Sequence, residues 1–452
     1  MPMVSDKSPI TFTDPLPEAT DVVVIGAGIA GTATAYFLAE RGVKVLLCEK
    51  GRVAGEQSSR NWGWVRQQGR DRAELPIMIE SNLIWRELAE KTGEPDLQFT
   101  RSGSCYLAKE EKTVDKFEQW LELAKQHQLD TKILSRREVE ERFPNVAASL
   151  SGGMVTESDG RAEPFVAVPA LARAARALGA TVIEACAVRT LDMEAGHIAG
   201  VITEKGRVRC SSVVLAGGVW STHFAANAGV SLPQLAVRST AARTEPVPEH
   251  YSPNLVLGGL GTHDGLAARR RADGGYTVST GDLAEHYISP VSFKYFTKFL
   301  KLMKIYADFF SLHLAAPKNY PGAWSTPRRW SSDEVSPFER MRVVNPEPSP
   351  VVVRQIKERM PRWLPDLKDA RLVESWAGMI DVTPDAVPIL GEDGKLAGLF
   401  FATGLSGHGF GIGPGIGRVT ADLVSGRSCG HDLHRFRPSR FFDGSKIVPG
   451  PL

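Results

Sequence analysis

Apolar and polar positions near the start of the chain follow two different periods. Val22–Ile25 is an unbroken apolar run rich in β-branched residues, typical of a strand buried on both faces. A helical pattern follows, with four apolar residues between Ala33 and Leu38, and it ends at Gly42, a residue type common just past a helix. A second apolar run at 43–48 predicts another strand. This opening stretch therefore indicates a strand, a helix and a strand in series.

The turn before the predicted helix contains Gly26, Gly28 and Gly31 at G-x-G-x-x-G spacing. The first glycine permits a tight turn, the second lets backbone approach a pyrophosphate, and the third lets helix pack on strand. The helix N-terminus then faces the anion. Glu49 follows about 20 residues later, where a carboxylate accepts a hydrogen bond from a ribose hydroxyl. The residues predicted to bind a dinucleotide here are Gly26, Gly28, Ile29, Ala30, Gly31, Glu49 and Lys50.

A later segment favours a flavin over a nicotinamide. Val213–Ala216 reads as a buried strand and is followed at once by Gly217 and Gly218. A nucleotide-binding sheet that resumes after about 160 residues of other material is unusual in the compact NAD domain and typical of flavoproteins. Short strands are expected between 182 and 209. From these segments Val188, Ala216, Gly217 and Trp220 are predicted to contact the cofactor.

The C-terminal third contains seven glycines in the fourteen residues Gly404–Gly417. Each glycine costs a helix interior about 1 kcal/mol relative to alanine, so this stretch is predicted as a loop, with a helix only after it. Backbone amides of such a loop would stabilise negative charge on a reduced flavin. A flexible loop without a ligand is the alternative. The predicted cofactor contacts are Gly404, Gly407, His408, Gly409, Phe410 and Gly411.

Composition excludes several classes of protein. The 452 residues are 42% hydrophobic and 23% charged, which is ordinary for a globular chain of about two domains. A net charge of only +2 does not indicate nucleic-acid binding. Five scattered cysteines without a C-x-x-C pair argue against a disulfide framework and a metal site, and favour a reducing compartment. The polar residues 1–19 lack the apolar core of a secretory signal, and they are predicted to form a mobile arm.

Four motifs occur in one order: the N-terminal fingerprint, AGGVWS at Ala216–Ser221, WAGMIDVTPDAVPILG at Trp376–Gly391, and TGLSGHGFGIGPGIG at Thr403–Gly417. Together they resemble the D-amino-acid-oxidase-like (DAO) superfamily, which includes glycine and sarcosine oxidases, D-amino acid dehydrogenases and membrane-associated bacterial L-amino acid deaminases. The resemblance covers about residues 20–430. It implies a Rossmann-like FAD-binding domain interleaved with an antiparallel-sheet substrate domain, an α/β architecture.

The segment Ser58–Asp71, SSRNWGWVRQQGRD, is most similar to the deaminase branch. The resemblance implies that hydroxyls here meet the pyrophosphate and that the following residues pass beside the flavin. It also implies that a glutamine, Gln67 or Gln68, helps to hold a substrate carboxylate. No cysteine lies within thirty residues of Gly378, where sarcosine oxidases tether the flavin, so FAD is expected to be non-covalent. The implied cofactor contacts are Ser58, Ser59, Arg60, Asn61, Trp62 and Gly63.

A hairpin is predicted at 266–280, around Asp273-Gly274-Gly275. Arg269 and Arg271 share one face of its first strand, and a guanidinium matches a carboxylate bidentately. The resemblance makes them candidates for the substrate clamp, although a solvated basic turn is the alternative. His408 could face the flavin, and Trp376 could line the pocket. Each could equally be a structural residue.

Residues 292–316 form a basic amphipathic segment. Lys294, Lys298, Lys301 and Lys304 line one helical face, opposite an apolar face. Four lysines make it a poor membrane span. It could lie in a membrane interface or cover the substrate domain as a lid. The deaminase resemblance favours the interface, and with it a respiratory quinone or cytochrome as electron acceptor.

After the arm at 1–19, the chain is predicted to divide into two interleaved domains and a C-terminal tail. Residues 20–75, 151–235 and 371–430 form the FAD-binding domain, 76–150 and 236–370 the substrate domain with a helical insertion at 290–325, and 431–452 a C-terminal tail.

The favoured function is FAD-dependent oxidative deamination of an amino acid, in the cytoplasm or on the cytoplasmic face of the inner membrane. Oxidation of a secondary amine such as sarcosine or proline is a second hypothesis. A non-catalytic flavin-holding subunit and an NAD dehydrogenase are the others.

Overall fold

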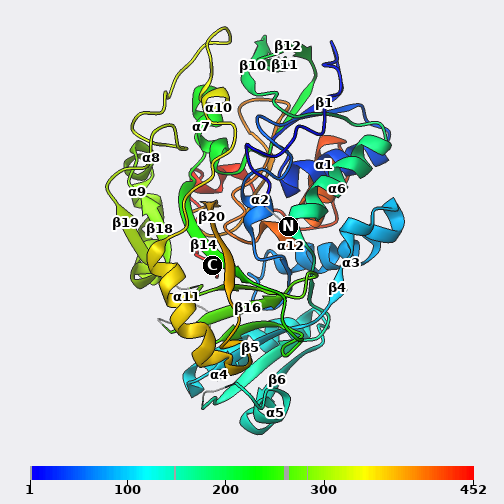
Figure 1. Ribbon diagram of the computed structural model, residues 1–452. Helices are drawn as coiled ribbons and strands as arrows, with labels where there is room; N and C mark the ends of the chain where they lie inside the picture. Colours follow the sequence, from blue (N-terminus) through cyan, green and yellow to red (C-terminus); the bar gives the residue numbers. More distant parts are fainter. Residues whose placement is uncertain (1–2, 147–148, 259–263, 282, 452) are drawn as a thin grey trace.

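A six-stranded sheet carries the glycine turn, in a computed structural model that describes residues 3–146, 149–258, 264–281 and 283–451 (Figure 1). All neighbouring strands are parallel except the edge strand β21, which is antiparallel to β22. The strand order is β21 (Ile389–Glu392), β22 (Leu399–Thr403), β13 (Ser212–Leu215), β1 (Val22–Ile25), β2 (Val45–Cys48) and β9 (Thr181–Ile183).

Both faces of this sheet are covered, which explains the unbroken apolar runs. Val22 and Val24 of β1 pack into a core formed with helices on one side, while Val23 packs into a second core on the other. The second core includes Val201 and Val208 from a three-stranded antiparallel sheet. The helices are α1 (Ile29–Glu40), α3 (Leu75–Thr92), α6 (Pro164–Ala177) and α12 (Gly409–Val424), and the small sheet is β10 (Val188–Glu194), β11 (His197–Thr203) and β12 (Gly206–Arg209).

A larger, mostly antiparallel sheet forms the second part of the molecule, with α4 (Glu111–Gln126), α5 (Arg136–Arg142) and α11 (Pro350–Trp363) packed on it. The predicted hairpin is present as β16 and β17. The strand order is β19 (Phe310–His313), β18 (Ala284–Tyr287), β14 (Leu235–Thr244), β17 (Tyr276–Ser279), β16 (Leu266–Arg270), β15 (Asn254–Leu257), β5 (Ser104–Ala108), β7 (Gly152–Thr156) and β6 (Thr131–Ser135), with β20 (Leu372–Val382) paired to β14.

This architecture confirms the predicted α/β class, but two strands lie in another sheet than expected. β7 was expected with the FAD-binding part, and it pairs instead with β5 and β6 of the large sheet. β20 was expected there too, and it pairs along its whole length with β14. Strand pairing is a non-local property, so an apolar run alone does not identify its partner.

The segment before β1 is not a mobile arm. Phe12 is buried, and the amides of Thr11 and Phe12 donate to the Glu184 carboxylate at 2.5 and 3.1 Å. Thr13 and Ala19 form bridges to Ile183 and Arg209. The polar composition of residues 1–19 gave no sign that Phe12 is buried. It also gave no sign that the distant Glu184 accepts hydrogen bonds from the backbone amides of this segment.

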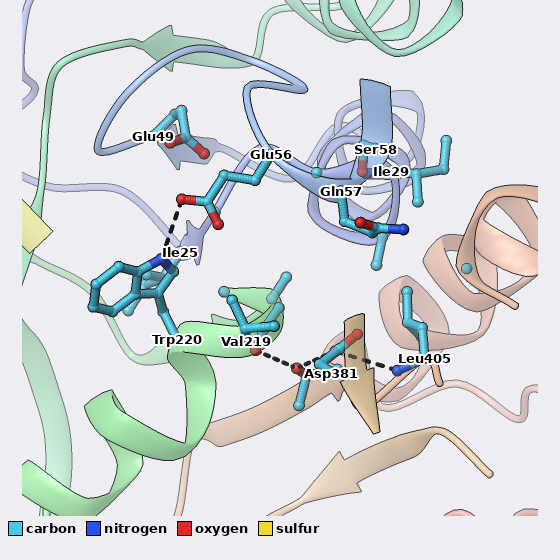
Figure 2. A pocket seen from close by; sticks show the side chains of 18 of the residues that line it. Ile25, Ile29, Glu49, Glu56, Gln57, Ser58, Val219, Trp220, Asp381 and Leu405 are labelled. Carbon is cyan, nitrogen blue, oxygen red and sulfur yellow. Dashed lines mark hydrogen bonds between the residues drawn. The ribbon is translucent and has the colours of Figure 1, made fainter. Parts of the chain in front are cut away.

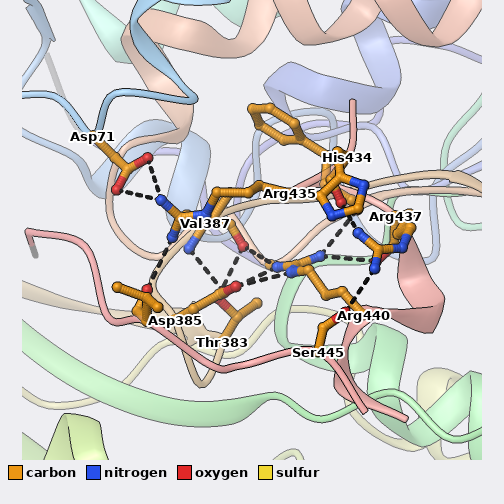
Figure 3. A network of polar contacts seen from close by, with 12 residues as sticks. Asp71, Thr383, Asp385, Val387, His434, Arg435, Arg437, Arg440 and Ser445 are labelled. Carbon is orange, nitrogen blue, oxygen red and sulfur yellow. Dashed lines mark hydrogen bonds and ion pairs between the residues drawn. The ribbon is translucent and has the colours of Figure 1, made fainter. Parts of the chain in front are cut away.

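The C-terminal tail is packed as well (Figure 3). Arg440 and Asp385 form a buried bidentate pair, with N–O distances of 2.9 and 3.0 Å. Arg435 pairs with Asp71 at 3.0 Å. Through these pairs the tail is fastened to the T-P-D turn and to the loop before α3. They hold the C-terminal tail against these two segments.

The basic amphipathic segment is shorter and more divided than the predicted helix over 292–316. It consists of α8 (Pro290–Lys294), α9 (Phe296–Ile305), a turn of 3-10 helix and the strand β19, which pairs parallel to β18. Phe299 is buried, whereas Phe296, Leu300 and Met303 are exposed. Among the described residues no helix is both long and apolar enough to cross a bilayer.

The glycine-rich stretch is mostly helix, contrary to the prediction. α12 begins at Gly409, so Gly411, Gly413, Gly415 and Gly417 all lie inside it. A Cβ on Gly413 would lie 2.3 Å from Ile29, and one on Gly417 would lie 2.5 Å from the backbone of Ala33. The glycines are there because α12 lies against α1 and α3 at backbone contact distance. That gain in packing outweighs their low helix propensity.

Candidate active site

A deep pocket opens at the carboxyl edge of the six-stranded sheet, where the glycine turn meets α1 (Figure 2). Most of the predicted cofactor contacts line it. These are Gly26, Gly28, Ile29, Ala30, Glu49, Lys50, Ser58, Asn61, Val188, Ala216, Gly217, Trp220, Gly407, Gly409 and Phe410. The other predicted contacts, Gly31, Ser59, Arg60, Trp62, Gly63, Gly404, His408 and Gly411, do not line this pocket.

The turn has the geometry of a dinucleotide site. Gly26 has φ +100°, and a Cβ on Gly31 would lie 1.9 Å from the carbonyl oxygen of Gly26. A side chain at Gly31 would therefore collide with the turn, and glycine at this position lets α1 pack directly against it. Ser58 comes from the short helix α2 (Gln57–Arg60), and its hydroxyl accepts from the Ile29 amide at 2.9 Å, at the start of α1. Helix amides and a hydroxyl at one point form a site for a pyrophosphate.

Glu49 and Asp381 sit in different halves of the pocket. Glu49 accepts from the amides of Ala27 and Gly51 at 2.8 and 2.7 Å, and burial raises its carboxyl pKa. Asp381 accepts from the Gly404 amide at 2.7 Å, and burial raises its pKa to about 6. Glu49 lines the pocket just after β2, and its role toward a ribose stays a prediction. Asp381 was missed, because nothing in its local sequence shows that β20 ends beneath the 404–407 turn.

Lys50 is held away from solvent by Glu56, at 2.5 Å, and lies over the ring of Trp220. Glu56 also accepts from the Trp220 indole at 3.1 Å (Figure 2). The pair fixes one wall of the pocket. Ser59 is turned inward, with its hydroxyl on the Glu56 carbonyl, and Gly63 packs on Ala162 and Arg269.

A second cavity of about 380 Å³ joins the first. Gln57, Asn61, Gly407 and Phe410 line both, so a planar group in the first pocket would face directly into the second. Apolar and aromatic side chains make up most of its wall. Its other linings include Trp62, Trp64, Leu283, Tyr306, Phe309, Phe310, Ile380, Val382, His408, Arg60, Arg66, Arg70 and Pro451.

Three arginines line this apolar cavity: Arg60, which donates to the Gly55 carbonyl and to the Asn345 side chain, and Arg66 and Arg70, which come from one loop. Arg70 is buried, and its Nη1 has no hydrogen-bond partner among the described residues. Burial and the neighbouring Arg66 lower its pKa to about 9, so it remains charged at neutral pH. Arg66 donates to the Gln68 carbonyl at 2.5 Å and lies over the ring of Tyr106. The Arg70 Nε donates to the Arg66 carbonyl at 3.3 Å, so Nη1 is the part of this guanidinium that a carboxylate could satisfy.

Gln67 and Gln68, the predicted carboxylate ligands, do not reach this cavity. The Gln67 side chain donates to Ser158 and Asp159 at 3.0 and 3.2 Å. The Gln68 side chain accepts from Thr156 at 2.9 Å. They brace the loop that carries Arg66 and Arg70. Alternation along an extended segment could have indicated that Arg66 and Gln67 face opposite ways.

Arg269 and Arg271 are also placed elsewhere. Arg269 is almost completely buried and forms an ion pair with Glu163 at 2.8 Å, while Arg271 pairs with Asp273 at 3.0 Å. Burial raises the pKa of the Glu163 carboxyl, but the Arg269 guanidinium outweighs this and holds it below its usual value. Neither arginine lines the second cavity. Trp376 does not line it either, and its indole donates to the Arg60 carbonyl at 2.8 Å.

Replacing Arg269 by methionine is expected to lower stability and leave substrate affinity unchanged. The substitution leaves Glu163 charged and largely buried without its partner, which costs about 3 kcal/mol. Chemical unfolding of the FAD-loaded protein measures the first effect, and KM for a carboxylate substrate measures the second. A KM that rises tenfold or more at unchanged stability would return Arg269 to the role of clamp.

The last described residues close one side of the second cavity. Lys301 donates to the Ile447 carbonyl at 3.0 Å and Arg435 to the Val448 carbonyl at 2.9 Å. The Gly450 amide donates to the Asp385 carbonyl at 2.9 Å, and Pro451 lines the cavity beside Tyr306. Residues 447–451 are called the C-terminal strap below.

Deleting residues 447–452 is expected to shift preference toward bulkier substrates. The strap occupies space next to Tyr306, and each methylene that a pocket accepts or rejects is worth about 1–3 kcal/mol. The ratio of kcat/KM between the largest and smallest accepted substrate should rise roughly tenfold. Val448→Ser, at a side chain 49% exposed, is the control. An unchanged ratio would show that the strap does not bound the substrate.

Together the fold and the glycine-turn pocket define a dinucleotide-dependent oxidoreductase, with an apolar, arginine-lined cavity beside the cofactor pocket. The family model of the FAD dependent oxidoreductases, DAO, matches residues 21–423. The chain belongs to this family, as the sequence resemblance predicted, and its cofactor is FAD.

The structure is similar to that of an L-amino acid deaminase from Proteus myxofaciens in complex with anthranilate, with 31% identity and a TM-score of 0.89 over 98% of this chain and 100% of that one. Mitochondrial sarcosine dehydrogenase from Mus musculus is 25% identical over 94% of this chain, which spans 42% of that enzyme's length. Glycine oxidase from Geobacillus kaustophilus is 26% identical over 93% of this chain and 97% of that enzyme.

Proposed function

We propose that the protein oxidises an α-amino acid with FAD and releases a keto acid and ammonia. The observation that carries this is the unpaired Nη1 of Arg70, in an apolar cavity that shares four lining residues with the FAD pocket. An amino acid has the one group that such a cation needs, a carboxylate. It also has an apolar remainder that the aromatic walls accommodate.

In this proposal the main contribution of the protein is to hold the substrate in position beside the FAD. Arg70 and Arg66 hold the carboxylate, and Trp62, Trp64 and Phe410 exclude water from the reacting carbon. Bound FAD supplies a hydride acceptor for the Cα hydrogen. Fixing one end of the substrate in a closed cavity reduces the entropic part of the barrier, which is a large share in well-oriented reactions. The imino acid then hydrolyses in water.

The relatives named above act on different substrates, so the class of amine that this protein oxidises must be determined by experiment. The test is anaerobic bleaching of the bound flavin by a panel of L-, D- and N-methyl amino acids, with ammonia measured after air is admitted. Bleaching by one stereochemical class of primary amino acids, with ammonia released, supports the proposal. Bleaching only by N-methyl or cyclic substrates without ammonia would replace it by a secondary-amine oxidation. No bleaching by any of them would overturn it in favour of a flavin-holding subunit.

We further propose that the segment from α8 to β19 contacts a membrane surface. Its exposed apolar side chains, at 293, 296, 300, 303, 305, 312 and 314, lie within one short stretch. Lys294 and Lys304 are exposed beside them. This surface carries the two features of an interfacial segment, apolar area and adjacent positive charge. Electrons from the flavin would then pass to a quinone or cytochrome in that membrane.

Sedimentation with vesicles containing anionic lipid tests this contact. The triple variant Phe296→Ser, Leu300→Ser, Met303→Ser should lose at least tenfold in partitioning, because it removes most of the apolar stripe of α9. The control replaces Leu83 and Leu178 by serine. These residues are about as exposed, at 51% and 47%, but Leu83 lies on α3 and Leu178 directly follows α6. Equal partitioning of the two variants would restrict the segment to its role as a wall of the substrate cavity.

A further inference from the structure

A buried histidine and a buried glutamate meet at the wall of the substrate cavity. Glu74 is the residue just before α3, and His408 the residue just before α12. The His408 Nδ1 lies 3.0 and 3.2 Å from the two carboxylate oxygens of Glu74. Glu74 is completely shielded from solvent, and His408 is nearly so. A contact across 334 positions of sequence holds these two helix starts together.

This contact decides which ring nitrogen faces the substrate. A nitrogen beside a carboxylate carries the proton, so Nδ1 is the donor and Nε2 has the free lone pair. No group in the described part of the chain bonds to Nε2. His408 lines the second cavity together with Ser406, Gly407 and Phe410. The lone pair is therefore available to a ligand in that cavity.

We propose that the His408 Nε2 accepts a proton from the substrate ammonium, with Glu74 as the residue that positions and polarises the ring. This inference rests on the proposed function, since it requires an amino acid in the cavity. The N–H bond of the ammonium breaks and a bond from the proton to Nε2 forms. The nitrogen lone pair so released assists departure of the Cα hydrogen with its two electrons to FAD, and the substrate leaves as an iminium ion.

The charges around the ring make this base dependent on the substrate. Burial, Arg70 and Arg66 lower the pKa of His408 to about 4, while Glu74 raises it. Within the part of the chain that the structure describes, Glu74, Arg70 and Arg66 are the charged groups that act on the ring, Arg60 lines the same cavity, and the Asp71–Arg435 pair lies near Glu74. Burial is the largest cause of this lowering, and a bound carboxylate would offset only the part that comes from Arg70 and Arg66. The basicity of His408 would therefore rise when the cavity holds an anion.

The pH dependence of anaerobic flavin reduction tests the role. Below the pKa of the substrate ammonium, the fraction of neutral amine rises tenfold per pH unit, so an enzyme without its base should gain rate with pH in that proportion. Glu74→Gln and His408→Asn should reduce flavin about 10-fold and about 100-fold more slowly than wild type near pH 7. Both should approach wild type near pH 10. Glu90→Gln, on the exposed face of α3, is the matched control.

A second measurement does not depend on turnover. In the FAD-loaded protein, a carboxylate without an amino group, 3-phenylpropanoate, should raise the His408 pKa observed by NMR by at least one unit. The same ligand should leave that pKa unchanged in Arg70→Met.

The outcomes separate the two proposals. Failure of every amino acid to reduce the wild-type flavin overturns the proposed function. Reduction of wild type, together with variants that remain equally slow at every pH, overturns only the base and reduces the Glu74–His408 contact to a structural one.

Discussion

Replacing Arg70 by methionine should lower kcat/KM for the amino acid roughly a hundredfold, almost entirely through KM. The guanidinium is buried and lacks a partner for Nη1, so a bound carboxylate gains a charge-assisted hydrogen bond that water does not weaken. Losing such a partner in a buried site costs about 3 kcal/mol. The variant should fold normally, because methionine fills similar volume and removes a buried charge that costs free energy in the empty protein.

Arg72→Met is the matched control. Arg72 belongs to the same loop, but it is exposed, and within the described part of the chain it donates only to Gln126, at 3.2 Å. Steady-state kinetics with one amino acid and thermal unfolding of both variants separate binding from stability. If Arg70→Met binds substrate as wild type does, the carboxylate clamp must be assigned elsewhere and the proposed function loses its main support.

Replacing Gly417 by alanine should destabilise the protein by about 3 kcal/mol and release FAD. A Cβ here would lie 2.4 Å from the Ala33 Cβ and 2.5 Å from the Ala33 carbonyl carbon. Backbone cannot retreat as a flexible side chain can, so α1 must move away from α12. Overpacking of a close interface costs about 1–3 kcal/mol and occasionally more. Because the glycine turn leads into α1, the displacement reaches the pyrophosphate site.

Gly394→Ala is the control, since a Cβ at Gly394 meets no atom within 4 Å. FAD retention after dialysis and unfolding in urea give the two readouts. In an unconstrained helix, alanine would stabilise by about 1 kcal/mol relative to glycine. A stabilised Gly417→Ala would therefore show that α12 and α1 are not in close contact.

Local patterns predicted the dinucleotide site well because its parts are adjacent in sequence. The turn of Gly26 and Gly28, the start of α1 and Glu49 all lie within one strand–helix–strand unit. Short-range geometry decides what each of these residues does. The same reasoning succeeded for the hairpin of β16 and β17, where the turn residues determine the connection.

The arginine proposed to bind the substrate carboxylate could not be predicted in the same way. Whether a buried arginine is free to bind an anion depends on whether another residue already forms an ion pair with it. Arg269 and Arg70 look alike in sequence, yet Glu163 neutralises the first and nothing in the described residues pairs with Nη1 of the second. Glu163 is 106 positions from Arg269. The glycine-rich helix posed the same difficulty, since its propensity is poor and only its neighbours make glycine necessary. Phe12 likewise shows its role only against Glu184 and the sheet edge.

The C-terminal strap has a practical consequence for work on this enzyme. Pro451 lines the substrate cavity beside Tyr306, so an affinity tag or fluorescent protein fused to the C-terminal strap would begin close to the cavity wall. The fused residues would compete with substrate for that space or pull Gly450 away from Asp385. Kinetic constants from such a fusion would describe an altered cavity.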